Sequence, residues 1–177
     1  MLIALLVSAM IAVGWLTVRS MNREKARHRR AAAIAAAART QQGGGDLYVS
    51  LEDSRLVGLS AGGATLVLGR GEDTRAVPAA SLLAVEGLRD GQVMIRAELA
   101  GDPVTPTPMA QQTVADLPDR ILSLGLRVTV ESEAFEVLFF DGGRHGVSPS
   151  NEAFRKQAAQ TEAWFKRLST AMRLARA

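Results

Sequence analysis

Residues 55–68 read RLVGLSAGGATLVL, and this stretch predicts two short β-strands joined by a tight turn. Both halves are apolar, and the small residues SAGG between them are typical of a hairpin. Moving outward, similar apolar runs bounded by turn residues predict strands at 74–77, 82–88 and 92–99. An Asp-Gly turn joins the last two of these. The region is therefore predicted to be rich in antiparallel β-structure.

Two more strands are predicted closer to the C-terminus, at residues 124–130 and 135–140. Before them, four of the six prolines lie between residues 100 and 118. This composition predicts an exposed loop or insertion, which is either a plain connection or a partner-binding loop.

The C-terminal region has the pattern of one long amphipathic helix. Ser148 is the expected N-cap, with Pro149 at the first helical position. Apolar side chains then recur at steps of three and four residues, which predicts that one face of the helix lies on a sheet. These residues are Phe154, Ala158, Thr161, Phe165, Leu168 and Met172.

The N-terminal residues 1–18, MLIALLVSAMIAVGWLTV, contain no charged side chain. A helix of this length is near the lower limit for crossing a bilayer core of about 30 Å. No basic residue precedes it and no small-x-small motif follows it. These features favour an uncleaved transmembrane anchor over a cleaved signal peptide or a buried helix. Because basic residues flank its C-terminal end, we expect the N-terminus outside and the following domain in the cytoplasm.

Residues 19–40 predict a basic, Ala-rich juxtamembrane helix, and the Gly-rich residues 41–46 predict a linker. The basic residues either set the topology or bind anionic lipid headgroups. The candidates are Arg19, Arg23, Lys25, Arg27, Arg29 and Arg30. Residues 19–40 carry seven Lys or Arg and one Glu, whereas residues 41–177 carry 14 Lys or Arg and 17 acids. The basic charge therefore belongs to the helix, and no nucleic-acid partner is expected.

No motif in the chain indicates an enzymatic activity. Its 177 residues include no cysteine, and the acidic residues are scattered over predicted turns, so neither a metal site nor a cofactor is predicted. The most site-like stretch is DGGRHG at 141–146, where Arg144 and His145 could bind an anion or a partner. It has neither a phosphate-loop ending nor a nucleophile elbow. No catalytic residue is therefore predicted, and a hydrolase site near His145 is the weakest alternative.

Several short apolar motifs carry a family resemblance through their order along the chain. They are Val57-Gly58-Leu59, Leu66-Val67-Leu68, Val77-Pro78, Leu83-Ala84-Val85-Glu86, residues 126–130, Val137, Phe139, Phe140, Ala163-Trp164 and Leu168. The sequence resembles the pleckstrin-homology-like (PH-like) fold, and in particular small bacterial membrane-anchored proteins with this fold. The resemblance implies an α+β protein: an N-terminal transmembrane helix, then a bent seven-stranded β-barrel or sandwich over residues 47–177, capped by the C-terminal helix.

The anchor and the resemblance together imply a single-pass protein of the bacterial inner membrane. Its cytoplasmic PH-like domain is expected to be a non-enzymatic protein-interaction or scaffold module. The alternative is a peripheral module that senses anionic lipids through the basic helix. Lipid-binding PH domains hold inositol phosphates with Lys and Arg along the first hairpin, whereas the turn here is Ser60-Ala61-Gly62-Gly63. A protein partner is therefore the leading expectation.

Overall fold

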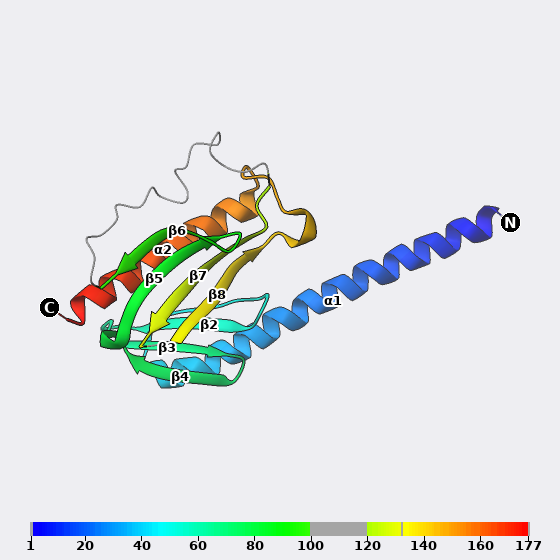
Figure 1. The fold of residues 1–177 in the computed structure, drawn as a ribbon. Helices are drawn as coiled ribbons and strands as arrows, with labels where there is room; N and C mark the ends of the chain where they lie inside the picture. The colour runs from blue at the N-terminus through cyan, green and yellow to red at the C-terminus, as the bar shows by residue number, and fades with distance from the viewer. Residues whose placement is uncertain (1, 100–119, 132, 177) are drawn as a thin grey trace.

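The computed structural model describes residues 2–99, 120–131 and 133–176 (Figure 1). The helices are α1 (Leu2–Gln42) and α2 (Glu152–Leu174). The strands are β1 (Gly45–Val49), β2 (Arg55–Ser60), β3 (Thr65–Arg70), β4 (Asp73–Pro78), β5 (Leu82–Arg89), β6 (Gln92–Glu98), β7 (Ser123–Val130) and β8 (Glu133–Asp141). The insertion predicted at 100–118 lies outside the described residues.

The strands form two antiparallel sheets of four strands each. Sheet 1 has the order β1-β2-β3-β4, and sheet 2 has the order β6-β5-β7-β8. Within the described ranges no strand pairing joins the two sheets into a closed barrel. The α+β content agrees with the sequence, but the predicted seven-stranded PH-like barrel is wrong. Eight strands form two open sheets because the hydrogen-bonded ladder ends at β4 and starts again at β5.

The strand that sequence reasoning missed is β1, which begins inside the predicted linker. Gly43 and Gly44 take positive φ angles directly after α1, so the chain reverses and β1 starts at Gly45. A Cβ atom at Gly45 would clash with the carbonyl oxygen of Leu59 on β2. The close approach of these two strands therefore requires glycine, and α1 is tied directly to sheet 1.

Helix α1 is continuous over 41 residues. In the described part of the chain, no helix combines the length and the apolar character needed to span a membrane. The prediction of a transmembrane anchor at 1–18 is therefore wrong. The integral inner-membrane localisation that depended on this anchor is wrong as well.

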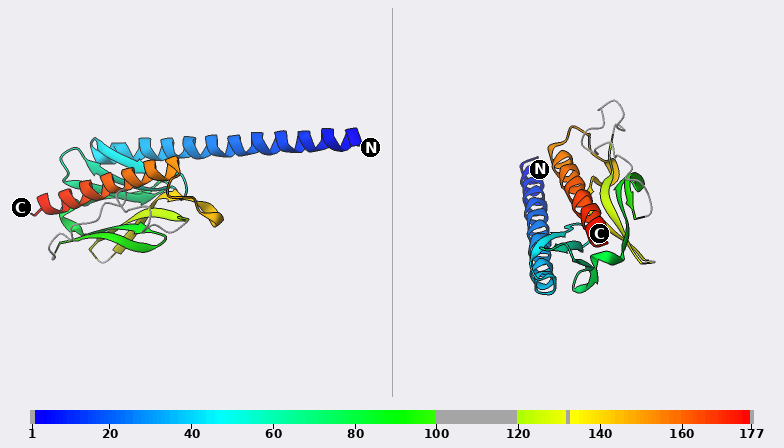
Figure 2. Two further views of the ribbon diagram at one scale, coloured as in Figure 1. Left: turned by 90° about the horizontal axis from the view of Figure 1, so that it is seen from above. Right: turned by 90° about the vertical axis from the view of Figure 1, so that its left-hand side faces the viewer.

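The main hydrophobic core lies between sheet 1, sheet 2 and α2, and Figure 2 shows α2 covering one face of sheet 2. All six positions predicted for the buried helix face, the polar Thr161 included, are buried, which confirms the amphipathic pattern. The start of the helix differs from the prediction. Asn151 is the N-cap, and its side-chain oxygen accepts the backbone N–H of Phe154 at 3.1 Å. Ser148 instead accepts the backbone N–H of Ser150, in the turn before the helix.

Sheet 1 is covered on its other face by α1. Ile34 and Ala38 of the helix pack against Leu56 on β2 and Val67 on β3, and all four side chains are buried. Their neighbours Val57, Leu66 and Leu68 point into the main core instead. Successive side chains of a strand point to opposite faces. These consecutive apolar residues therefore pack alternately against the main core and against α1. The C-terminal part of α1 is therefore an outer layer of the domain.

Tyr48 on β1 links the two sheets. Its ring stacks on Phe139 of β8, with 3.8 Å between the ring centroids. Its hydroxyl lies 3.3 Å from the backbone carbonyl oxygens of both Leu138 and Phe139, to which it donates. Burial raises the pKa of the Tyr48 hydroxyl, and the nearby carboxylates of Asp53 and Glu52 raise it further.

A Tyr48→Phe variant keeps the stacked ring but removes the hydroxyl. We expect the free energy of unfolding at neutral pH to fall by about 1 kcal/mol. Below the ordinary tyrosine pKa of about 10, the hydroxyl is protonated in both states and adds no pH dependence. Above that pH, the unfolded state loses the proton first, so the wild type loses stability as the pH rises. Urea denaturation at several pH values should show a weaker alkaline loss in the variant.

A row of charged side chains crosses the outer face of sheet 2. Glu86 on β5 is 6% exposed and lies between two arginines. Its oxygens are 3.1 Å from Arg96 Nε on β6 and 3.1 Å from Arg127 Nη1 on β7. Arg127 Nη2 continues the row to Glu136 on β8, at 2.6 Å. This row follows the strand register, in which Glu86 is opposite both arginines and Arg127 is opposite Glu136.

Replacing Glu86 with Gln should lower the free energy of unfolding by about 2 kcal/mol, because two arginines lose a buried carboxylate partner. The matched control is Glu133→Gln, which breaks the exposed 2.6 Å pair with Arg75. That change should cost about 0.5 kcal/mol or less. Equal losses in chemical denaturation would show that the row contributes no more than an ordinary surface ion pair.

Candidate functional site

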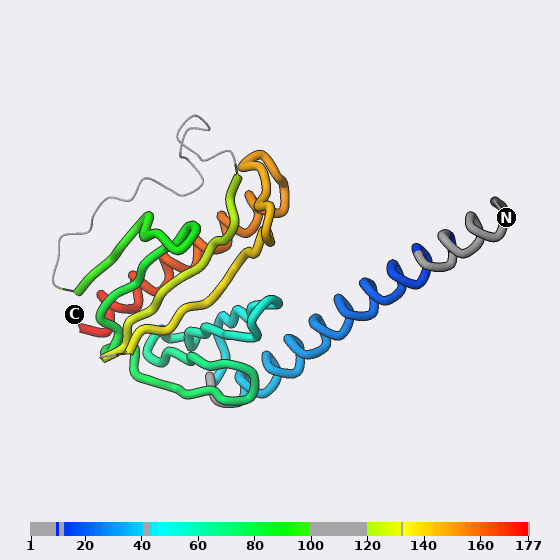
Figure 3. Tube along the Cα trace, turned by 45° about the vertical axis from the view of Figure 1, so that its right-hand side comes forward, coloured from blue at the N-terminus to red at the C-terminus, as the bar shows by residue number. Residues whose placement is uncertain are grey.

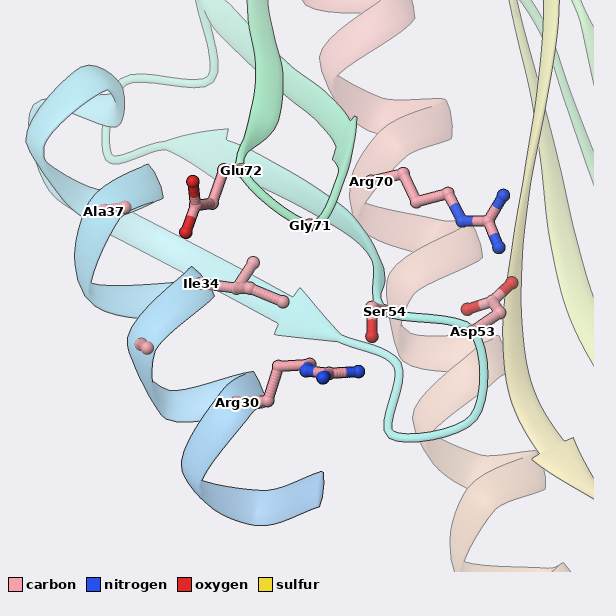
Figure 4. Close-up of a pocket in the computed structure, with 9 residues that line it drawn as sticks. Arg30, Ile34, Ala37, Asp53, Ser54, Arg70, Gly71 and Glu72 are labelled. Atoms are coloured by element: carbon pink, nitrogen blue, oxygen red, sulfur yellow. The ribbon is translucent and has the colours of Figure 1, made fainter. Parts of the chain in front are cut away.

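A groove lies where α1 packs beside the turns of sheet 1, and we call it the α1 groove. It has a volume of about 580 Å³. Figure 4 shows helix residues on one side and residues of the facing turns on the other. The lining residues are Arg30, Ala33, Ile34, Ala37, Asp53, Ser54, Arg70, Gly71 and Glu72. This volume falls within the range of pockets that bind small ligands or a few side chains.

Two turns form the wall of the groove that faces α1. Ser54, just before β2, has a φ of 58°, and Gly71, just after β3, has a φ of 63°. The backbone N–H of Gly71 donates to the carbonyl oxygen of Ser54 at 2.8 Å. This hydrogen bond ties the β1–β2 turn to the β3–β4 turn. The wall of the groove is therefore fixed by backbone contacts.

The charged side chains of the groove are not paired with one another. Among the described residues, no ion pair includes Arg30, Arg70 or Glu72, whereas Asp53 contacts Arg55 at 3.5 Å. In the register of β2 and β3, Arg55 lies directly opposite Arg70. Like charges in opposite positions of neighbouring strands are unfavourable. Arg70 follows Leu66 and Leu68 on the inner face of sheet 1. In Figure 4 its guanidinium lies toward the carboxylate of Asp53 and away from α1.

The N-terminal part of α1 projects away from the two sheets (Figure 3). Every described side chain from Met10 to Arg29 is exposed, and we call this stretch the α1 arm. Its large apolar side chains are 55% to 75% exposed: Met10, Val13, Trp15, Leu16, Val18 and Met21. At 3.6 residues per turn, they are spread around the helix instead of forming one stripe. The arm is an apolar surface with no cover in the described structure.

The structure places the six predicted basic residues along α1, but they do not form one cluster. Arg19 lies over the ring of Trp15, 4.9 Å from its centroid. Arg27 forms an exposed ion pair with Glu52 at 3.3 Å. Arg30 lines the groove, where the helix meets the domain. The remaining three, Arg23, Lys25 and Arg29, are exposed on the arm.

The predicted Gly-rich loop lies apart from the α1 groove. It forms the short 3-10 helix η3 (Gly143–His145), in which Arg144 and His145 are exposed. Arg120 donates to the backbone carbonyl oxygen of His145 at 3.0 Å, and Asp141 accepts the backbone N–H of Gly143 at 2.7 Å. These contacts hold the loop through its backbone. Neither of these two contacts involves the imidazole of His145.

Comparisons with known proteins return no family for this chain. It matches no family model, no curated protein and no solved structure. Over the described ranges, no group of three or more His, Cys, Asp or Glu residues could hold a metal ion. No comparison supports the PH-like resemblance, which stays a prediction. The functional argument therefore rests on the arm and the groove.

Sequence reasoning named Arg30 but missed the rest of the groove. Asp53, Ser54, Arg70 and Glu72 lie at strand ends and turns, where polar residues are expected in any case. One feature of the sequence could have predicted that α1 covers sheet 1. It is the pair of consecutive apolar runs Leu56-Val57 and Leu66-Val67-Leu68. Consecutive apolar residues indicate a strand that is covered on both faces, so sheet 1 needed a second cover.

An Ile34→Ala variant tests how α1 is held. Ile34 belongs to a small cluster that is separate from the main core, so its loss should release α1 locally. We expect faster hydrogen exchange and faster proteolysis within residues 30–40, while β5 and β7 keep their protection. The control is Ala33→Ser, which changes an exposed neighbour on the same turn. Simultaneous loss of protection in both sheets would contradict separate stabilisation of α1.

Proposed function

We propose that this protein is a non-enzymatic protein-interaction module, in which the two-sheet domain holds the α1 arm as the contact element. The observation that carries the proposal is the exposure of the large apolar side chains of the arm. Trp15 and Leu16, for example, are 59% and 58% exposed. Exposed apolar surface of this extent on one element is typical of an interaction site.

The charge of the arm narrows the choice of partner. Five basic residues from Arg19 to Arg29 share the arm with one acid, Glu24. Two copies of this stretch aligned in parallel would repel each other, which disfavours simple pairing of identical arms. A partner with acidic residues beside an apolar surface complements both properties. The partner class that we propose is therefore an acidic, apolar-faced segment of another protein.

The proposal is tested with the full chain carrying a photo-crosslinking residue at Leu16. The control carries the same residue at Lys156, on the exposed side of α2. We expect a discrete protein adduct from position 16 alone, lost when Val13 and Val18 are both changed to Glu. The captured protein, once purified, should bind the wild-type chain and not the double variant. Equal capture from both positions, or capture that survives the double variant, would contradict the proposal.

A second candidate is binding to anionic lipid headgroups at a membrane surface. It is favoured by the exposed cations of the arm and by Arg19, which lies over Trp15. Arg and Lys near an anionic surface each contribute about 1 kcal/mol.

Vesicle flotation of the full chain distinguishes the two candidates. Lipid recognition requires binding to anionic vesicles that weakens strongly in an Arg23→Gln, Lys25→Gln, Arg29→Gln variant. A chain that binds a protein partner should show little difference between anionic and neutral vesicles. The wild-type chain with neutral vesicles gives the background due to apolar contact alone.

A further inference from the structure

We propose that the outer edge of β6 is a self-association surface, at which β6 of one molecule pairs antiparallel with β6 of a second copy. This inference goes beyond the proposed function, because it concerns sheet 2 and not the α1 arm. In the order β6-β5-β7-β8, β6 lies at one end of the sheet (Figure 1). Within the described ranges β6 pairs with β5 alone, so the other side of its backbone faces no strand there.

The direction of the backbone groups of β6 follows from its pairing with β5. The N–H of Leu99, just after the strand, donates to the carbonyl oxygen of Leu83 on β5 at 3.1 Å. In an antiparallel ladder, alternate residues bond to the same neighbouring strand. Ala97 therefore bonds toward β5, whereas the N–H and C=O groups of Arg96 and Glu98 point away from the sheet. A strand laid along this edge can bond to both residues.

The opposite edge of sheet 2 is already occupied by side chains of sheet 1. On β8, the carbonyl oxygen of Glu136 accepts from Arg55 at 2.8 Å, and that of Leu138 accepts from the hydroxyl of Tyr48 at 3.3 Å. Natural proteins often protect an exposed strand edge with lysine, with proline or by keeping the strand very short. The seven residues of β6, QVMIRAE, include neither lysine nor proline. The edge of β6 therefore lacks these protections.

The charges on β6 favour a second copy as the occupant and select one register. Arg96 and Glu98 are two residues apart, so their side chains share one face of the strand, and they are 54% and 43% exposed. A two-fold axis at Ala97 places Arg96 of each copy opposite Glu98 of the other. An axis at Arg96 or at Glu98 would instead place identical charges opposite each other, which is unfavourable.

The contacts within one copy are compatible with this register. Arg96 contacts Glu86 through Nε at 3.1 Å and Glu98 through Nη2. A guanidinium group has five N–H donors, so Arg96 can also contact Glu98 of the second copy. At the axis, the two Ala97 residues form a pair without hydrogen bonds, in which side chains come closest, and a methyl group is small enough for this approach. The register shift between β5 and β6 lies elsewhere, between Gly87 and Leu88.

Sedimentation equilibrium of the full chain tests the proposal. We expect the wild type to show a concentration-dependent equilibrium between monomer and dimer. Glu98→Pro removes an N–H that points outward and leaves the N–H groups that bond to β5. This change should raise the dissociation constant at least about tenfold, because each copy loses a hydrogen bond to the other. A wild-type chain that stays monomeric up to millimolar concentration would overturn the inference.

A charge reversal tests the register and leaves every backbone N–H in place. Glu98→Arg puts arginines opposite each other at both ends of the interface, so dimerisation should weaken about tenfold. The matched control is Glu133→Arg on β8, which makes the same change in net charge at a side chain that is 65% exposed. Equal weakening by both variants would show that overall charge governs association, which overturns the register. Circular dichroism spectra of the Glu98 variants should match the wild type, because Glu98 is exposed.

A variant of the α1 arm separates the two surfaces. The full chain with Val13→Glu and Val18→Glu keeps β6 unchanged, so it should dimerise with the dissociation constant of the wild type. Dimerisation that this variant loses and the Glu98 variants keep would place self-association in α1 and overturn the inference. Dimerisation that depends on Glu98, together with no partner captured at Leu16, would support this inference while the proposed function fails.

Discussion

Strands β2 and β3 bury apolar side chains on both faces of sheet 1, and the rest of the structure is arranged around this constraint. Leu66 and Leu68 face the core, while Leu56 and Val67 face outward. Leaving such side chains in water would cost on the order of 1.5–3 kcal/mol each. Sheet 1 therefore needs two covers: α2 and sheet 2 on the inside, and the C-terminal part of α1 on the outside.

This packing also explains the position of the candidate site. Because Ile34 and Ala38 dock on sheet 1, the preceding turn of α1 brings Arg30 beside the turn that contains Ser54 (Figure 4). The same docking directs the N-terminal part of α1 away from the domain (Figure 1). The α1 arm and the α1 groove thus both result from the docking of α1 on sheet 1. A partner that contacts the arm is already close to the groove.

The two sheets differ in how they meet solvent. Sheet 1 is covered by helix on its outer face, whereas the outer face of sheet 2 carries the charged row centred on Glu86. In this row, acidic and basic side chains lie opposite each other on neighbouring strands. A shift of one residue would separate these ion pairs, so the row favours the observed strand register. Cross-strand ion pairs therefore cover the outer face of sheet 2, whereas α1 covers the outer face of sheet 1.

Local patterns in the sequence determined most of the elements. The hairpins at 55–68 and 82–99, the strand pair at 124–140 and the buried face of α2 all follow from apolar spacing and turn residues, because these signals act within a few residues. Strand β1 was missed, because glycines that usually mark a linker here allow β1 to lie close against β2. Only the tertiary structure decided that the sheets stay open, that α1 covers sheet 1, and that Arg30 and Arg70 line one groove. These features depend on contacts between segments distant in the chain, which local periodicity does not encode.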